Sequence, residues 1–193
     1  KKVSELSQSQ RERFIELADQ WRRGGEERGF SMALGRICDD RDSDVVVTWG
    51  ELNGEPVAFL QFVPWAQDGL SLDIMRRSES VETGINEAMI SETVEYARSH
   101  GIQQISLNFA TFRSIFERGS KLGAGPITRL NYRILRFLSR FAQMESLYRF
   151  NAKFRPEWEP RFVIYPGATH LIRTTVAILT IESFWPPFKI GKR

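Results

Sequence analysis

An Asn-Gly dipeptide at positions 53 and 54 constrains the fold of this chain more than any other short segment. It joins Asp44–Trp49, which is rich in β-branched residues, to a second apolar run at Pro56–Trp65. Asn-Gly favours the two-residue turn whose twist matches that of paired antiparallel strands. The sequence therefore predicts a β-hairpin, and a third strand, Leu70–Met75, follows it.

A first helix is predicted before the hairpin. Four apolar residues recur there at helical spacing, namely Phe14, Leu17, Ala18 and Trp21. Ser9 has Glu12 three residues further on, which predicts a capping box at the helix start. Gly24-Gly25 predicts the helix end.

The rest of the chain is richer in predicted helices. We expect a helix at about Gly84–His100 with Gly101 as its cap, and a fourth strand at Gln104–Phe109. The other expected elements are a short helix at Phe112–Lys121, a helix at about Ile127–Met144, a late strand at Arg161–Tyr165, and Leu171–Glu182, where periodicity leaves strand and helix open. This order predicts a mixed α/β (α+β) class with a partly antiparallel sheet. At 193 residues we expect a single domain.

The charge of the chain is distributed unevenly. The net charge is only +3, yet Arg118–Met144 contains no acidic residue. Its cations are Arg118, Lys121, Arg129, Arg133, Arg136 and Arg140. The last four fall within roughly 60° of one helix face. Two interpretations stay open: a strip of guanidinium groups that binds phosphates, and a solvated face with acidic partners elsewhere in the fold.

The cysteine count, the hydropathy and the two ends of the chain bear on its cellular location. Cys38 is the only cysteine, so an internal disulfide is excluded and a reducing compartment is favoured. No apolar run is long enough to span a bilayer. Because the chain starts at Lys1 without Met, we expect a fragment of a longer protein. Residues 183–193 are aromatic and cationic, which suits either a membrane interface or a disordered tail.

The end of the third strand is the first candidate site. Asp73 and Arg76 precede a loop into a helix, where α/β proteins often place working groups. Strict alternation puts Asp73 on the face of Ser71 and Met75, with Arg76 on the other, unless a bulge intervenes. The alternative is a structural ion pair or a solvated strand end. The following loop, Ser78–Gly84, has one glycine and two glutamates, which argues against a coenzyme A pyrophosphate cradle.

Two further segments carry candidate groups. Glu117 is either a substrate contact or a solvated charge. The block Phe150–Arg161 interleaves aromatic, basic and proline residues, which suits either core packing or contact with phosphate and a base. His100 and His170 lack metal ligands at suitable spacing, so no metal site is expected.

Five segments together resemble one family. They are Ser71–Arg76, Gly84–Glu87, Ser106–Ala110, Phe116–Arg118 and Phe150–Tyr165. They resemble the soluble C-terminal domain of phosphatidylglycerol lysyltransferases, the multiple-peptide-resistance lipid aminoacylases. The likeness runs from about Gly29 to Tyr165. It implies a GNAT-like acyltransferase fold, which the family usually carries in two copies, whereas this chain has room for one copy with extra helices.

The resemblance also implies a reaction and its setting. An amino acid resembling lysine would move from aminoacyl-tRNA to the glycerol hydroxyl of phosphatidylglycerol, with aminoacyl-tRNA as co-substrate and no other cofactor. The chain would be a soluble domain of an integral membrane protein, at the cytoplasmic face of the cell membrane and next to its own transmembrane region.

Residue roles follow by position in the family. Asp73, Arg76 and Glu117 are the predicted catalytic residues. The predicted substrate-binding residues are Asn108, Arg118, Lys153, Arg155 and Arg161, and the predicted contacts to lipid or tRNA phosphates are Arg129, Arg133, Arg136 and Arg140. The alternative function is a noncatalytic GNAT-like module that binds anionic lipid or RNA. A CoA-dependent acyltransferase ranks third.

Overall fold

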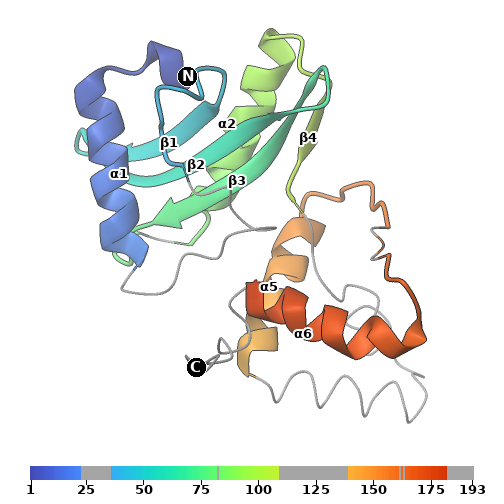
Figure 1. The fold of residues 1–193 in the computed structure, drawn as a ribbon. Helices are drawn as coiled ribbons and strands as arrows, with labels where there is room; N and C mark the ends of the chain where they lie inside the picture. The colour runs from blue at the N-terminus through green and yellow to red at the C-terminus, as the bar shows by residue number, and fades with distance from the viewer. Residues whose placement is uncertain (23–35, 82, 109–138, 161, 163, 182–193) are drawn as a thin grey trace. The chain divides into compact units, whose positions relative to one another are not determined.

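The computed structural model describes residues 1–22, 36–81, 83–108, 139–160, 162 and 164–181 (Figure 1). The chain divides into two compact units, Lys1–Asn108 with Arg173–Arg193, and Phe109–Ile172. Each is described by itself below, and the single domain expected from the length stays a prediction.

The first unit contains a curled mixed sheet. Its elements are η1 (Val3–Glu5), α1 (Gln8–Arg22), β1 (Val46–Leu52), β2 (Glu55–Trp65), β3 (Gly69–Arg77), α2 (Ile85–Ser99) and β4 (Gln104–Ser106). The strand order is β1-β2-β3-β4, antiparallel except for the parallel pair β3 and β4. A parallel pair needs a crossover, and α2 supplies it. The predicted mixed α/β class with a partly antiparallel sheet is confirmed.

Two predicted glycine turns are confirmed by the backbone conformation. Asn53 and Gly54 have φ values of 55° and 82°, as the predicted hairpin turn requires. Gly101, with φ of 70°, follows α2. There the Ile102 N–H donates to the Ala97 carbonyl at 3.0 Å, which satisfies one carbonyl at the helix end.

The start of α1 differs from the expected one. Ser7 Oγ accepts the Gln10 N–H at 3.2 Å, and Gln10 Oε1 accepts the Ser7 N–H at 3.0 Å. The capping box is therefore Ser7 with Gln10, and the prediction of Ser9 with Glu12 is wrong. Because the helix begins at Gln8, Ser9 already lies inside the first turn.

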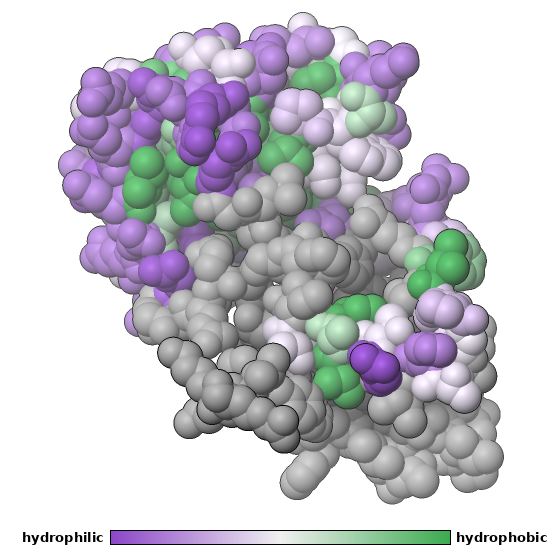
Figure 2. Space-filling view, in the orientation of Figure 1, coloured by the Kyte–Doolittle hydropathy of each residue, from purple (hydrophilic) through white to green (hydrophobic). Residues whose placement is uncertain are grey.

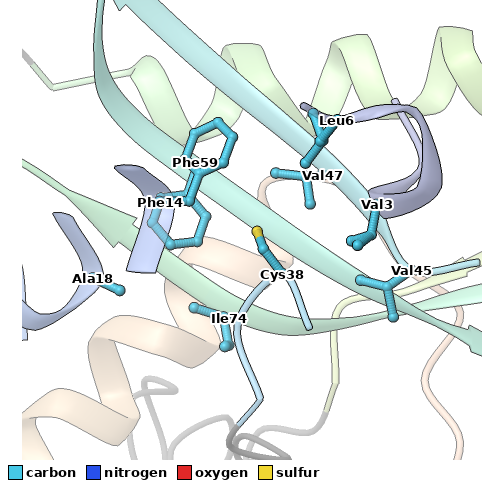
Figure 3. Packing of buried hydrophobic residues seen from close by; sticks show 9 residues of the cluster. All are labelled: Val3, Leu6, Phe14, Ala18, Cys38, Val45, Val47, Phe59 and Ile74. Atoms are coloured by element: carbon cyan, nitrogen blue, oxygen red, sulfur yellow. The ribbon is translucent and has the colours of Figure 1, made fainter. Parts of the chain in front are cut away.

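The sheet is covered by a different helix on each face (Figure 1). On the α1 face, Phe14 packs against Phe59 and Trp49, with ring centroids 5.3 and 5.5 Å away. The apolar cluster of this face comprises Val3, Leu6, Phe14, Ala18, Cys38, Val45, Val47, Phe59 and Ile74 (Figure 3). On the α2 face, the Thr93 hydroxyl lies 2.8 Å from that of Thr48. The outward side of α1 is mainly hydrophilic (Figure 2).

The remaining described elements are helical. They are α5 (Ser139–Ala152), η2 (Ala168–His170) and α6 (Leu171–Ile181). Helix α6 settles the alternative left open for that segment. Helix α5 overlaps the end of the predicted Ile127–Met144 helix, whereas residues 127–138 and the predicted helix at Phe112–Lys121 lie outside the described residues.

The predicted late strand at Arg161–Tyr165 is wrong for the residues that can be compared. Positions 162, 164 and 165 have no regular secondary structure. Pro160 and Pro166 bracket this segment, and proline removes the N–H that a strand ladder needs. None of the described helices is long and apolar enough to cross a membrane.

Candidate functional site

A β-bulge in β3 lies at Asp73. Phe62 of β2 pairs with Leu72 of β3, but the preceding residue, Gln61, pairs with Ile74. Asp73 therefore has no residue of its own opposite it on β2. An extra residue of this kind shifts the alternation of the strand and redirects side chains.

The bulge changes which residues share a face. Beyond it, Ile74 lies opposite Gln61 and Arg76 lies opposite Phe59, so both belong to the α1 face. Met75 lies opposite Leu60, which pairs with Thr48 on the α2 face. The alternation expected for an unbroken strand is therefore wrong for Met75 and Arg76. It holds for Ser71, which lies opposite Val63 on the α1 face.

Asp73 also belongs to the α1 face, because a side chain of that face binds it. The Gln61 Nε2 amide donates to Asp73 Oδ2 at 3.0 Å. Only 7% of Asp73 is exposed, and 1% of Gln61. A buried carboxylate needs such donors, since an unsatisfied one would carry a large desolvation cost. Asp73 and Arg76, predicted on opposite faces, thus lie on the same face of β3.

Gln61 connects the bulge to a segment without regular secondary structure. Its Nε2 also donates to the Arg36 carbonyl at 2.8 Å, and its Oε1 accepts the Cys38 N–H at 3.0 Å. The sequence analysis did not single out this residue. The available signal was a glutamine in the middle of the apolar run Ala58–Val63, where an amide must find partners inside the core.

Asn108 lies where the parallel pair ends. Strand β4 pairs with β3 only as far as Ser71 with Ser106. Beyond that point the Asn108 Nδ2 amide donates to the Leu72 carbonyl at 3.3 Å, and Asn108 itself has φ of 63°. A side chain thus continues the contact between the two strands up to the residue before Asp73.

Arg76 and Arg77 end the strand. Arg76 is partly buried, and its Nη1 donates to the Met75 carbonyl at 3.4 Å. Arg77 is exposed and donates to the Val81 carbonyl at 3.1 Å, which holds the loop after β3. These two arginines therefore lie at the end of β3, three and four residues after the buried Asp73.

Cys38 is not a nucleophile in this setting. Burial raises the pKa of the Cys38 thiol to about 12, and the nearby charge of Arg11 opposes this only partly. At neutral pH the thiol stays protonated, and the thiolate is the reactive form. Within the described part of the chain, no group of three or more His, Cys, Asp or Glu side chains is placed to hold a metal ion.

The other predicted site residues are placed only in part. Glu117, Arg118, Arg129, Arg133, Arg136 and Arg161 lie outside the described residues, as does the tail at 183–193, and Arg140 lies in α5 with its side chain undescribed. Lys153 and Arg155 follow α5 in the second unit, and both are exposed. The Lys153 ammonium lies 5.9 Å from the centre of the Phe150 ring. The roles predicted for all these residues stay predictions.

Residues 1–165 match a family model described as phosphatidylglycerol lysyltransferase, C-terminal. Among curated proteins, the lysylphosphatidylglycerol biosynthesis bifunctional protein LysX of Gordonia bronchialis is 44% identical over 194 residues, which cover 98% of this chain. The LysX protein of Mycobacterium avium is 49% identical over 171 residues, or 88% of this chain. This chain spans only 17% and 14% of the lengths of these relatives.

Solved structures match the fold. L-PGS from Bacillus licheniformis superposes with a TM-score of 0.65 at 18% identity, over 93% of this chain and 54% of the other. A C-terminal domain assigned to a lysylphosphatidylglycerol synthetase from Agrobacterium fabrum gives 0.67 at 20% identity, over 96% and 54%. The fold is therefore the one that the family resemblance predicted.

Proposed function

Because the chain belongs to the family of phosphatidylglycerol lysyltransferase C-terminal domains, we propose that it forms part of an enzyme that esterifies a lysyl group to phosphatidylglycerol. The biosynthetic names of its relatives support this proposal. The proposed donor is lysyl-tRNA, the proposed acceptor is the glycerol hydroxyl of the lipid, and no further cofactor takes part.

The proposed reaction is a transesterification. The glycerol hydroxyl oxygen attacks the ester carbonyl carbon of lysyl-tRNA and forms a new C–O bond. The C–O bond to the ribose then breaks, and the ribose oxygen takes up the proton that the glycerol hydroxyl loses. The donor ester is already activated, so alignment of the two substrates and modest proton transfer are the main requirements.

The bulge of β3 is the observation that carries the residue assignment. It places Asp73 and Arg76 on one face of the sheet, beside the end of the β3–β4 pairing. In the proposed mechanism Asp73 orients or deprotonates the acceptor hydroxyl, and Arg76 holds a phosphate or the developing oxyanion. Glu117 pairs with the ammonium group of the lysyl moiety.

We also propose that the cationic residues bind the phosphates of the two substrates. Both substrates carry phosphates, which arginine side chains bind through paired hydrogen bonds. The proposed contacts are Arg118, Arg129, Arg133, Arg136, Arg140, Lys153, Arg155 and Arg161. Because the acceptor is a membrane lipid, we place the domain at the cytoplasmic face of the membrane, as part of a longer protein.

Lipid analysis tests the proposal directly. The full-length protein in vesicles that contain phosphatidylglycerol should form lysyl-lipid when lysyl-tRNA is added, as detected by mass spectrometry. Free lysine in place of lysyl-tRNA should give none. Vesicle binding without any lysyl-lipid would instead favour a noncatalytic module that binds anionic lipid.

A substitution tests the role of Asp73. Asp73→Asn should lower the rate of lysyl-lipid formation by about 100-fold or more, as expected for loss of a general base. Asp19→Asn, in an exposed residue of α1, is the matched control and should keep the rate. A wild-type rate for Asp73→Asn would remove Asp73 from the mechanism.

A further inference from the structure

The bulge at Asp73 is held from both neighbouring strands by side-chain amides. On the β2 side, Gln61 donates to the Asp73 carboxylate. On the β4 side, Asn108 donates to the carbonyl of Leu72, the residue before Asp73. The first contact lies at the extra residue of the bulge, and the second lies just beyond the end of the β3–β4 pairing.

The orientation of the Gln61 amide is determined by its partners. The Cys38 backbone N–H can only donate, so the atom facing it must be Oε1. The Nε2 group then faces two acceptors, the Arg36 carbonyl and Asp73 Oδ2. Both N–H bonds of this buried amide are thus engaged, and the amide has no alternative orientation that satisfies its neighbours.

Asn108 is suited to its position by its backbone as well as its side chain. Its φ of 63° lies in the left-handed region, which Asn tolerates better than most residues. The Asn108 N–H donates to Ser106 Oγ at 3.2 Å, which stabilises the turn that brings the side chain back to β3. The turn and the amide together bind the end of β4 to the bulge.

We infer that Gln61 and Asn108 are positioning residues, which set the place and direction of the Asp73 carboxylate. The inference rests on the proposed function of Asp73. A reacting group held within a fraction of an ångström of its productive place gains rate from alignment, so loosening it lowers turnover more than substrate binding. Gln61 and Asn108 act through Asp73, and Asn108 thereby has a positioning role in place of the substrate contact implied by the family resemblance.

Two substitutions remove the contacts with little change in shape or backbone. Gln61→Met keeps the length of the side chain and removes its polar atoms. Asn108→Gly keeps the positive φ and removes the amide. In the full-length protein each variant should lower kcat for lysyl-lipid formation by about 10- to 100-fold, with KM for both substrates within about twofold.

The matched control is Thr93→Val. Thr93 is buried on the opposite face, where its hydroxyl donates to the Met89 carbonyl at 2.8 Å. This variant also removes a buried polar contact, so it should lower the melting temperature but keep kcat within about twofold. Losses of kcat that simply follow the losses of melting temperature in both Thr93→Val and Gln61→Met would overturn the inference.

A double substitution tests whether Gln61 acts through Asp73. The double variant Asp73→Asn, Gln61→Met should have a kcat within about twofold of that of Asp73→Asn alone, because the carboxylate that Gln61 positions is already lost. A full additional loss of 10-fold or more would show that Gln61 acts independently of Asp73, against the inference.

Hydrogen exchange supplies a readout that does not depend on activity. Asn108→Gly and Gln61→Met should speed amide exchange at Leu72–Ile74 by about 10-fold or more and leave Gly69–Ser71 and α2 unchanged. Uniformly faster exchange throughout the first unit would overturn the inference, even for a protein that makes no lysyl-lipid. If faster exchange is confined to Leu72–Ile74 but the protein makes no lysyl-lipid, the proposed function is rejected, whereas the role of the two amides in holding the bulge is supported.

Discussion

The two faces of the sheet bury their polar groups in different ways. On the α2 face, Thr48 and Thr93 satisfy each other, and Thr93 also bonds within its own helix. On the α1 face, Gln61 joins Asp73, Arg36 and Cys38, which come from a strand bulge and a segment without regular secondary structure. The first arrangement joins two hydroxyl groups across the contact of α2 with the sheet, whereas the second fixes the position of a carboxylate.

The largest expected difference in stability is between Gln61→Met and Thr93→Val. Gln61→Met removes a hydrogen-bond partner from the Cys38 N–H, the Arg36 carbonyl and the Asp73 carboxylate, and it should lower the free energy of unfolding by about 2–4 kcal/mol. Thr93→Val should cost about 1 kcal/mol, because Val keeps the volume and the Met89 carbonyl keeps its helical bond. Denaturant unfolding of both variants measures the difference. Equal losses of unfolding free energy in the two variants would mean that the buried polar contacts of the two faces contribute equally to stability.

The buried thiol of the α1 face should make stability pH-dependent. The pKa of the Cys38 thiol is about 12 in the folded state against an unperturbed 9.0. A raised pKa contributes stability that is fully present below pH 9 and is lost as the pH rises toward 12, with a slope of at most about 1.4 kcal/mol per pH unit. Cys38→Ala should remove this part of the slope.

Alkylation gives a second measurement on the same thiol. The folded protein should react with iodoacetamide at pH 8 far more slowly than the unfolded protein. Rapid labelling of the folded protein would show that the α1 face opens at Cys38, contrary to its burial.

The smallest expected effect concerns the start of α1. Ser7→Ala removes the acceptor for the Gln10 N–H and should cost about 1 kcal/mol. Ser9→Ala should change the free energy of unfolding by less than about 0.5 kcal/mol, because Ser9 caps no backbone N–H in the structure. Thermal unfolding of the two variants distinguishes the observed capping box from the one first expected. The reverse order would restore Ser9 as the cap.

Local chemistry explains which expectations were confirmed. The Asn53-Gly54 turn and the Gly101 cap depend on backbone conformations that these residue types prefer by themselves. The capping box was misplaced because Ser7 and Ser9 both have a suitable side chain three residues later. Choosing between them depends on how α1 meets the sheet, which no window of a few residues contains.

The candidate site was predictable in position and not in geometry. A strand-end Asp and Arg before a loop into a helix identified the region of Asp73 and Arg76. Their common face was not predictable, because the bulge arises from the pairing of β3 with β2. Gln61 was missed for the same reason, since its three partners lie 12, 23 and 25 residues away in the chain.

The sequence by itself determined the order of elements from α1 to β4, the turns at Asn53-Gly54 and Gly101, and the family, since these depend on local conformational preference and on residue types at fixed positions. Only the tertiary structure decided the register of β3, the face of Arg76 and the partners of Asp73. Register depends on which backbone groups of distant strands pair and which side chains they bury together, and one extra residue moves every later side chain to the other face.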